Sequence, residues 1–236
     1  MTGDARKISA KLKKLGDKKR AAILQRFFKT GPGEYGEGDV FLGIKVGDLR
    51  KVAREFSEIS GTDIRQLLRS RIHDERLVAL LILVRQFQRG DESKKRQIYE
   101  LYLRHTRFVN NWDLVDLSAP RIVGGYVADK SRKPLYQLAK SKSLWERRIA
   151  ILATSYLIKE NDFEDALKIA TVLLSDSEDL IHKAVGWMLR EVGKRDQKEE
   201  ETFLRRHYKT MPRTMLRYAI ERFPESKRQR YLTGKI

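Results

Sequence analysis

The sequence contains no cysteine, which excludes disulfide bonds, thiolate catalysis and zinc-finger chemistry. It has only five prolines and no Asn-Gly or Asp-Gly pair, which argues against a β-sandwich because that fold needs frequent turn signals. The four histidines are scattered and unpaired, and no His, Asp or Glu cluster has metal-ligand spacing. No Gly-rich phosphate loop follows a strand. We therefore expect no metal and no organic cofactor.

Long apolar runs are also missing. No stretch reaches the roughly 18 apolar residues that a membrane-spanning helix needs. The first 20 residues alternate charge with single apolar positions and lack the apolar core of a signal peptide. We expect a cytoplasmic protein.

Positive charge is in excess, with 50 Lys and Arg against 32 Asp and Glu, a net charge of +18. Basic residues outnumber acidic ones 10 to 2 in residues 1–29, 9 to 2 in 117–159 and 10 to 2 in 203–236. Such a balance is compatible with ordinary solvated helix faces. We favour a surface that follows phosphates, because clustered Lys and Arg gain affinity by releasing counterions from nucleic acid. A membrane surface is less favoured, since no helix pairs a basic face with an exposed apolar one.

A repeat is visible when three stretches that begin at Asp74, Trp145 and Leu180 are aligned. Their starts lie 71 and 35 residues apart, so the period is 35–36 residues and a missing member begins near Asn110. Each unit reads as a short helix, a turn and a longer apolar helix. This pattern predicts an all-α fold, an α-solenoid of HEAT-like helix pairs that is curved and has a basic concave face.

The chain is predicted to form one domain over residues 1–236, with helix-pair repeats in 57–236. Residues 1–56 form atypical capping helices. Within them, residues 30–45 contain five glycines and a proline and are predicted to be a loop between helices 17–29 and 45–56.

The helix around residue 187 has two contrasting faces. Its predicted core stripe consists of Ile181, Ala184, Val185, Met188 and Val192. Trp187 lies opposite, among Lys183, Arg190 and Lys194 at spacings i, i+4, i+7 and i+11. Burial of Trp187 by a neighbouring repeat is one explanation. We favour contact with an anionic, planar ligand, because a protein core does not accept unpaired cations.

The helix that starts near Trp145 shows a weaker version of this pattern. Trp145 and Tyr156 are predicted to lie on its core stripe. Arg148 is predicted to lie on a polar stripe that faces phosphates.

Residues 110–120, NNWDLVDLSAP, place two acids beside a tryptophan. Trp112 and Asp116 are i, i+4 neighbours at the edge of an apolar stripe. Asp113 points elsewhere and is explained by the helix dipole and by capping, with Asn110 or Asn111 as the N-cap. Asp116 either forms a salt bridge with a basic neighbour or has a role in chemistry.

A surface carboxylate weakens the binding of phosphates. Glycosidic bond cleavage gives a reason to keep one, because the sugar becomes an oxocarbenium-like cation in the transition state. A fixed carboxylate stabilises that cation more than the ground state, or orients the attacking water.

Three blocks together resemble the AlkD-type alkylpurine DNA glycosylases of the HEAT-like repeat class. They are NNWDLVD (110–116), WERRIAIL (145–152) and IHKAVGWMLRE (181–191), and the resemblance runs from about Arg20 to the C-terminus. It implies excision of N3- and N7-alkylated purines from duplex DNA. Such bases already carry positive charge, so they leave readily without a general acid. The resemblance also implies excision without drawing the base into a pocket.

By the same resemblance Asp116 is the catalytic carboxylate, and Trp112 and Trp187 contact the damaged nucleotide. Arg148 and Arg190 are implied to hold phosphates, with Lys183 and Lys194 beside them. The sequence departs from the family at Phe27, where we align a DNA-contacting tyrosine. Phe27 keeps the ring and loses the hydroxyl, and Tyr35 is a candidate substitute.

The partner implied is double-stranded DNA that contains alkylated purines, bound by a monomer associated with the nucleoid. Two other interpretations stay open. One is a non-catalytic HEAT-repeat protein that recognises distorted or branched DNA. The other is a solenoid that binds an acidic protein partner.

Overall fold

The computed structural model describes residues 3–236 and is all-helical there, as predicted. No β-strand occurs in that range; Val40 and Ile72 form an isolated parallel bridge. The chain divides into two compact units, the first ending at Ser118 and the second running over Ala119–Ile236. The prediction of a single domain, and that of a curved shape with a basic concave face, stay predictions.

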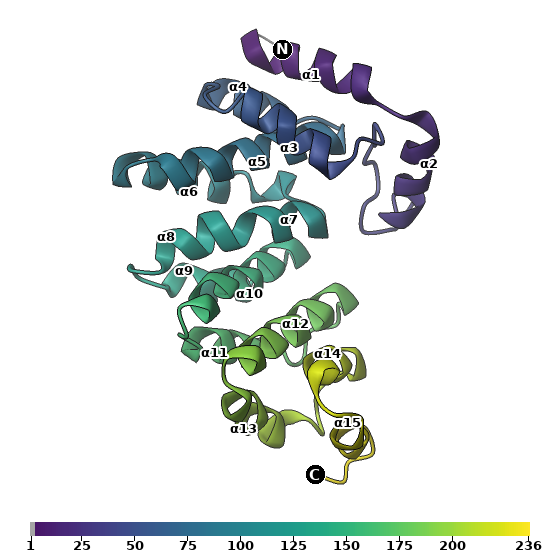
Figure 1. Ribbon diagram of the computed structural model, residues 1–236, viewed down its shortest axis with the longest axis vertical. Coiled ribbons are helices and arrows are strands. Elements are labelled where there is room, and N and C mark those ends of the chain that lie inside the picture. The colour runs from purple at the N-terminus through teal and green to yellow at the C-terminus, as the bar shows by residue number, and fades with distance from the viewer. Residues whose placement is uncertain (1–2) are drawn as a thin grey trace. The chain divides into compact units, whose positions relative to one another are not determined.

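The first unit contains seven α-helices and a short 3₁₀ turn among its described residues (Figure 1). They are α1 (Gly3–Leu15), α2 (Lys18–Phe27), α3 (Val46–Glu55), α4 (Gly61–Leu68), α5 (His73–Arg89), α6 (Glu92–Arg104), η1 (Thr106–Phe108) and α7 (Trp112–Ala119), whose last residue belongs to the second unit. Helix α5 packs against α3, α4 and α6, and α1 packs on α4. Thus α5 forms the centre of this unit.

The second unit repeats a simpler pattern. Its elements are η2 (Pro120–Gly124), α8 (Gly125–Val127), α9 (Lys133–Ala139), α10 (Leu144–Lys159), α11 (Glu164–Val172), α12 (Asp179–Arg195), α13 (Gln197–His207), α14 (Arg213–Ala219), η3 (Ile220–Arg222) and α15 (Glu225–Leu232). Helix α10 packs on α12, and α12 on α14, while α9 packs on α11 (Figure 1). Each helix pair therefore buries its apolar face against the next pair, as in an α-solenoid.

The stretches predicted to repeat are helical. The three aligned stretches form α5, α10 and α12, the longest helices of the described chain, and the missing member is α7. Helices α5 and α10 are buried over most of their length, whereas α12 buries one face. Helix α10 is buried from Arg148 to Thr154 without a break, so neighbouring helices cover almost all of its middle turns. None of the helices in residues 3–236 combines the length and apolar character needed to cross a membrane.

The predicted glycine-rich loop is confirmed between α2 and α3. At Gly36 a Cβ atom would lie 2.5 Å from the carbonyl oxygen of Phe28, and at Gly43, where φ is +82°, it would lie 2.3 Å from that of Asp17. Only glycine lets the loop pass so close to both ends of α2. The Asp74 carboxylate accepts the backbone N–H of Leu42 at 2.7 Å, which ties the loop to α5.

Helix α7 leads directly into a π-helical segment that starts at Pro120. Proline has no N–H and cannot donate to the carbonyl of Asp116 four residues earlier. The wider π-turn is one way in which a helix accommodates this missing bond, and such turns are frequent near functional sites. Its apolar side faces the interior, since Ile122 and Val123 are fully buried.

Candidate functional site

Trp112 and Asp116 lie on successive turns of α7 and therefore share one face of that helix. Asn111 precedes the helix: its backbone carbonyl accepts the N–H of Val115 at 3.1 Å, and its side-chain oxygen accepts that of Trp112 at 2.8 Å. This confirms Asn111 as the N-cap residue. Trp112 and Asp116 are both half-buried, so part of each side chain reaches solvent.

The Trp112 indole belongs to an aromatic wall formed with Phe27 and Phe28. It stacks on Phe28 with ring centres 4.9 Å apart and planes at 14°. The Phe27 ring meets it edge-on at 5.9 Å, within the range that favours aromatic pairs. Phe28 is buried, whereas Phe27 is 61 % exposed. Phe27 is the residue that we align with a DNA-contacting tyrosine. It thus offers an exposed aromatic surface beside Trp112.

Asp113 faces the interior, whereas Asp116 is half-buried. It is buried, and its carboxylate lies 2.9 Å from Nε2 of His73. The helix dipole and capping alone, our explanation of Asp113 from the sequence, leave out its contact with His73. The prediction that all four histidines are unpaired is wrong for His73, whose Nδ1 also lies 3.1 Å from the carboxylate of Asp39.

Asp39, in the glycine-rich loop, connects three elements. It accepts from Arg76 Nη2 on α5 at 2.6 Å and from Asn111 Nδ2 before α7 at 3.5 Å, besides its contact with His73. Burial by itself raises the pKa of Asp39, but the His73 hydrogen bond and the charges of Arg76 and His73 outweigh it and lower that pKa below its usual value. The carboxylate is therefore held in its charged form. Among residues 3–236, no group of three or more His, Asp or Glu side chains is arranged to hold a metal ion.

On α12, in the second unit, the predicted core stripe is buried and Trp187 is half-buried. Its indole Nε1–H donates to Glu191 at 3.0 Å. The contrast between the two faces of this helix is confirmed.

Each of the three predicted cations around Trp187 has an acidic partner. Lys183 pairs with Asp179 at 2.8 Å and Lys194 with Glu191 at 2.6 Å. Arg190 pairs with Glu221 of η3. The partners of Lys183 and Lys194 were visible in the sequence at i−4 and i−3, whereas no local pattern points to Glu221.

The predicted position of Arg148 on a polar, phosphate-facing stripe is wrong. The side chain is 5 % exposed, and its Nη1 donates to the backbone carbonyl of Leu180 at 2.5 Å. The neighbouring helix pair covers this side of α10, and a guanidinium can enter such an interface when it finds a carbonyl acceptor. Tyr156, predicted to be core, is instead 38 % exposed, and Trp145 is half-buried.

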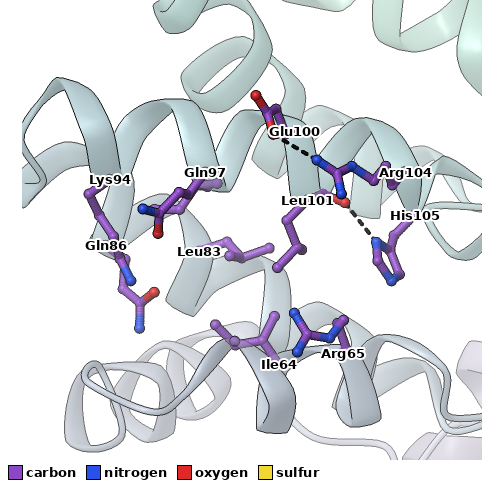
Figure 2. A pocket seen from close by; sticks show the side chains of 12 residues that line it. Ile64, Arg65, Leu83, Gln86, Lys94, Gln97, Glu100, Leu101, Arg104 and His105 are labelled. Carbon is purple, nitrogen blue, oxygen red and sulfur yellow. Dashed lines mark hydrogen bonds and ion pairs between the residues drawn. The ribbon is translucent and has the colours of Figure 1, made fainter.

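A separate hollow of about 350 Å³ lies in the first unit between α4, α5 and α6 (Figure 2). Ile64, Leu83 and Leu101 form its apolar floor. Among its polar groups, Arg104 pairs with Glu100, and His105 bonds the carbonyl of Leu101. None of the predicted site residues lines this hollow, so it contributes nothing to the candidate site.

Comparison with known families and structures agrees with this architecture. A family model described as DNA alkylation repair enzyme matches residues 8–223, and the chain belongs to that family. No curated protein matches the sequence.

Two solved structures share the fold. One, a predicted DNA alkylation repair enzyme from Enterococcus faecalis, superposes with a TM-score of 0.68 at 17 % identity and covers 89 % of this chain and 97 % of its own. The other, AlkD2 from Streptococcus mutans, has a TM-score of 0.56 at 16 % identity, with 88 % and 99 % covered. At such low identity these likenesses establish the all-α fold, and they leave the individual site residues open.

Proposed function

We propose that this member of the DNA alkylation repair family is a DNA glycosylase that removes N3- and N7-alkylated purines from duplex DNA. The observation that carries the proposal is the arrangement on α7. Asp116, a half-buried acid, follows by one helical turn an indole that extends an aromatic wall. A surface that only binds phosphates gains nothing from that acid.

In the proposed reaction the bond between C1′ and N9 of the purine breaks heterolytically. The electron pair stays with N9 and neutralises the cationic base, so no proton has to be supplied to the leaving group. The sugar becomes an oxocarbenium ion, which the Asp116 carboxylate stabilises. Water then adds to C1′ and releases a proton, which leaves an abasic site and the free alkylpurine.

The rings of Trp112 and Phe27 supply apolar and π-surface for the nucleotide next to Asp116. Four residues of α12 are proposed to contact the DNA backbone: Lys183, Trp187, Arg190 and Lys194. Their acidic partners have to be displaced by phosphates when DNA binds. Arg148 is left out of this set because it is buried. The hydroxyl-free ring of Phe27 makes a stacking contact and no hydrogen bond to phosphate.

The test measures the single-turnover release of 7-methylguanine and 3-methyladenine from methylated duplex DNA, with mass spectrometry to detect the free bases. The wild-type protein is expected to release both bases. Asp116→Asn keeps the size of the side chain and removes its charge. It should lower the rate constant by about 100-fold or more, while DNA affinity is retained or improved because a like charge is lost.

Asp129→Asn is the matched control, because Asp129 is an exposed acid that pairs with its neighbour Lys130. Its rate should equal that of the wild type. If Asp116→Asn releases bases at the wild-type rate, Asp116 is not catalytic. If the wild-type protein releases none but binds duplex DNA in a salt-dependent manner, the non-catalytic DNA-binding interpretation holds. Weak duplex binding even at low salt would instead favour an acidic protein partner.

A further inference from the structure

A buried set of polar side chains lies beneath the aromatic wall. We call it the His73 cluster and define it as Asp39, His73, Arg76, Asn111 and Asp113. All five side chains are buried. They come from three separate segments: the glycine-rich loop, the start of α5 and the start of α7. The proposed reaction assigns no role to any of them.

With both carboxylates charged, the geometry favours a positively charged His73. Its two ring nitrogens lie 3.1 Å and 2.9 Å from carboxylate oxygens of Asp39 and Asp113. A neutral imidazole has one N–H and one lone pair, so it can donate to only one of these acids. The imidazolium donates to both. The cluster then holds two cations, His73 and Arg76, and two anions, and its charge is balanced.

Electrostatics agrees with this assignment. Burial lowers the pKa of His73, but the charge of Asp113 and the hydrogen bonds to Asp113 and Asp39 outweigh it, so the pKa of His73 lies above its usual value. Arg76 opposes this rise. The remaining acid that acts on His73 is Asp74, which bonds the loop amides of Leu42 and Ile44.

The residues immediately before and after Trp112 both belong to the His73 cluster. Asn111, before it, bonds Asp39, and Asp113, after it, bonds His73. A series of stacked aromatic rings also connects His73 to Trp112. His73 stacks on Phe41 at 4.3 Å, Phe41 on Phe28 at 4.8 Å and Phe28 on Trp112 at 4.9 Å. The backbone and the ring of Trp112 therefore both depend on where His73 lies.

We propose that His73 is a positioning residue, which as an imidazolium between Asp39 and Asp113 fixes the first turn of α7 and with it Trp112 and the Asp116 carboxylate. This inference rests on the proposed glycosylase function. It assigns His73 no contact with DNA, since the side chain is 2 % exposed. The pairing also neutralises Asp113, so α7 offers only the charge of Asp116 to the substrate.

Two variants test it, because they change the cluster in opposite ways. His73→Gln provides no cation and cannot donate to both acids. In Asp113→Asn, a neutral His73 donates from Nδ1 to Asp39 and accepts from the new amide through Nε2, so the geometry survives without the imidazolium. His207→Gln is the matched control, because it makes the same substitution on α13.

The first readout is the pH profile of single-turnover base release. The folded pKa of His73 is raised, so its hold on Asp113 is complete at low pH and lost as the pH rises through that value. The wild-type rate constant should therefore fall as the pH rises above the usual value of 6.5 and through the raised pKa of His73, whereas that of Asp113→Asn should not. His73→Gln should be slower by about 10- to 100-fold at neutral pH, the scale expected for a misplaced catalytic group, with duplex affinity unchanged. His207→Gln should match the wild type.

The second readout does not depend on activity. Protein labelled with 5-fluorotryptophan should show three ¹⁹F resonances, one for each tryptophan of the sequence, and Trp112→Phe identifies that of Trp112. His73→Gln should shift this resonance and leave the other two in place. The inference is overturned if the Trp112 signal does not move, or if Asp113→Asn keeps the loss of rate at rising pH. Absence of base release by the wild type, with the Trp112 signal shifted as expected, overturns the proposed function alone.

Discussion

The anchoring of the glycine-rich loop can be tested by removing one negative charge with Asp39→Asn. Asp39 is the loop residue that reaches both α5 and the start of α7, and its carboxylate accepts three side-chain contacts at 2.6, 3.1 and 3.5 Å. The amide retains a single acceptor oxygen and directs an N–H₂ group towards donors. Arg76 would then lose its ion pair with Asp39, and His73 would keep its contact with Asp113 but lose the one with the Asp39 carboxylate.

The expected loss of stability follows from that burial. Removing one partner of a buried ion pair costs about 3–5 kcal/mol, because the remaining charge is left uncompensated. Since a domain is stable by only about 5–15 kcal/mol, the variant should unfold at clearly lower denaturant concentration. The pKa of Asp39 is lowered in the fold, so its stabilisation is present above its unfolded value of 3.8 and lost as the pH falls through the lower folded value. The gap between the two proteins should therefore close in acid.

Urea denaturation followed by circular dichroism measures the free energy of unfolding at neutral and acidic pH. Hydrogen exchange of the amides in residues 30–45 should show faster opening of the loop in the variant. Asp48→Asn is the control, because Asp48 forms an exposed pair with Lys51 and its loss should leave stability unchanged. Equal stability of the Asp39 and Asp48 variants at neutral pH would refute the idea that the cluster anchors the loop.

Two other predictions concern the second unit. Glu221→Gln removes the charge that Arg190 pairs with on η3, so duplex DNA should bind about two- to five-fold more tightly at low salt, the range of a partly exposed ion pair. Fluorescence anisotropy at several salt concentrations measures this affinity. Unchanged affinity would remove Arg190 from the proposed DNA contacts. Burial, with the charge of Glu201 adding to it, raises the pKa of Glu200 to about 8. Stability should therefore fall as the pH rises from about 4.5 through 8, and Glu200→Gln should be increasingly more stable than the wild type over that range in thermal melts; parallel stability curves would contradict this.

The sequence was sufficient to predict the helices and the loop, because these depend on local pattern. The apolar spacing in residues 180–194 predicted the buried side of α12 and placed Trp187 outside it, where the structure has it half-buried. The spacing of Trp112 and Asp116 placed them on one face as soon as that stretch was a helix. The glycines of residues 30–45 marked a loop correctly, since few other residues fit its approach to α2.

What the sequence could not predict are contacts between distant segments. His73 looked isolated because its partners lie 34 and 40 residues away. Arg148 looked solvent-facing because a single-helix wheel contains no information about the next helix pair, which covers it. Tyr156 was misplaced for the same reason. On a central helix such as α10 almost every face is apolar, so periodicity no longer separates inside from outside.

The close passage of the loop at Gly36 and Gly43 limits how this part of the chain can vary. A methyl group at either position would overlap a main-chain oxygen that cannot move without displacing α2. Libraries built to alter lesion preference near Phe27 should hold both positions constant. Diversity is better introduced at the exposed residues Pro32 and Glu37, whereas Gly33 should be kept because its φ of +75° suits only glycine.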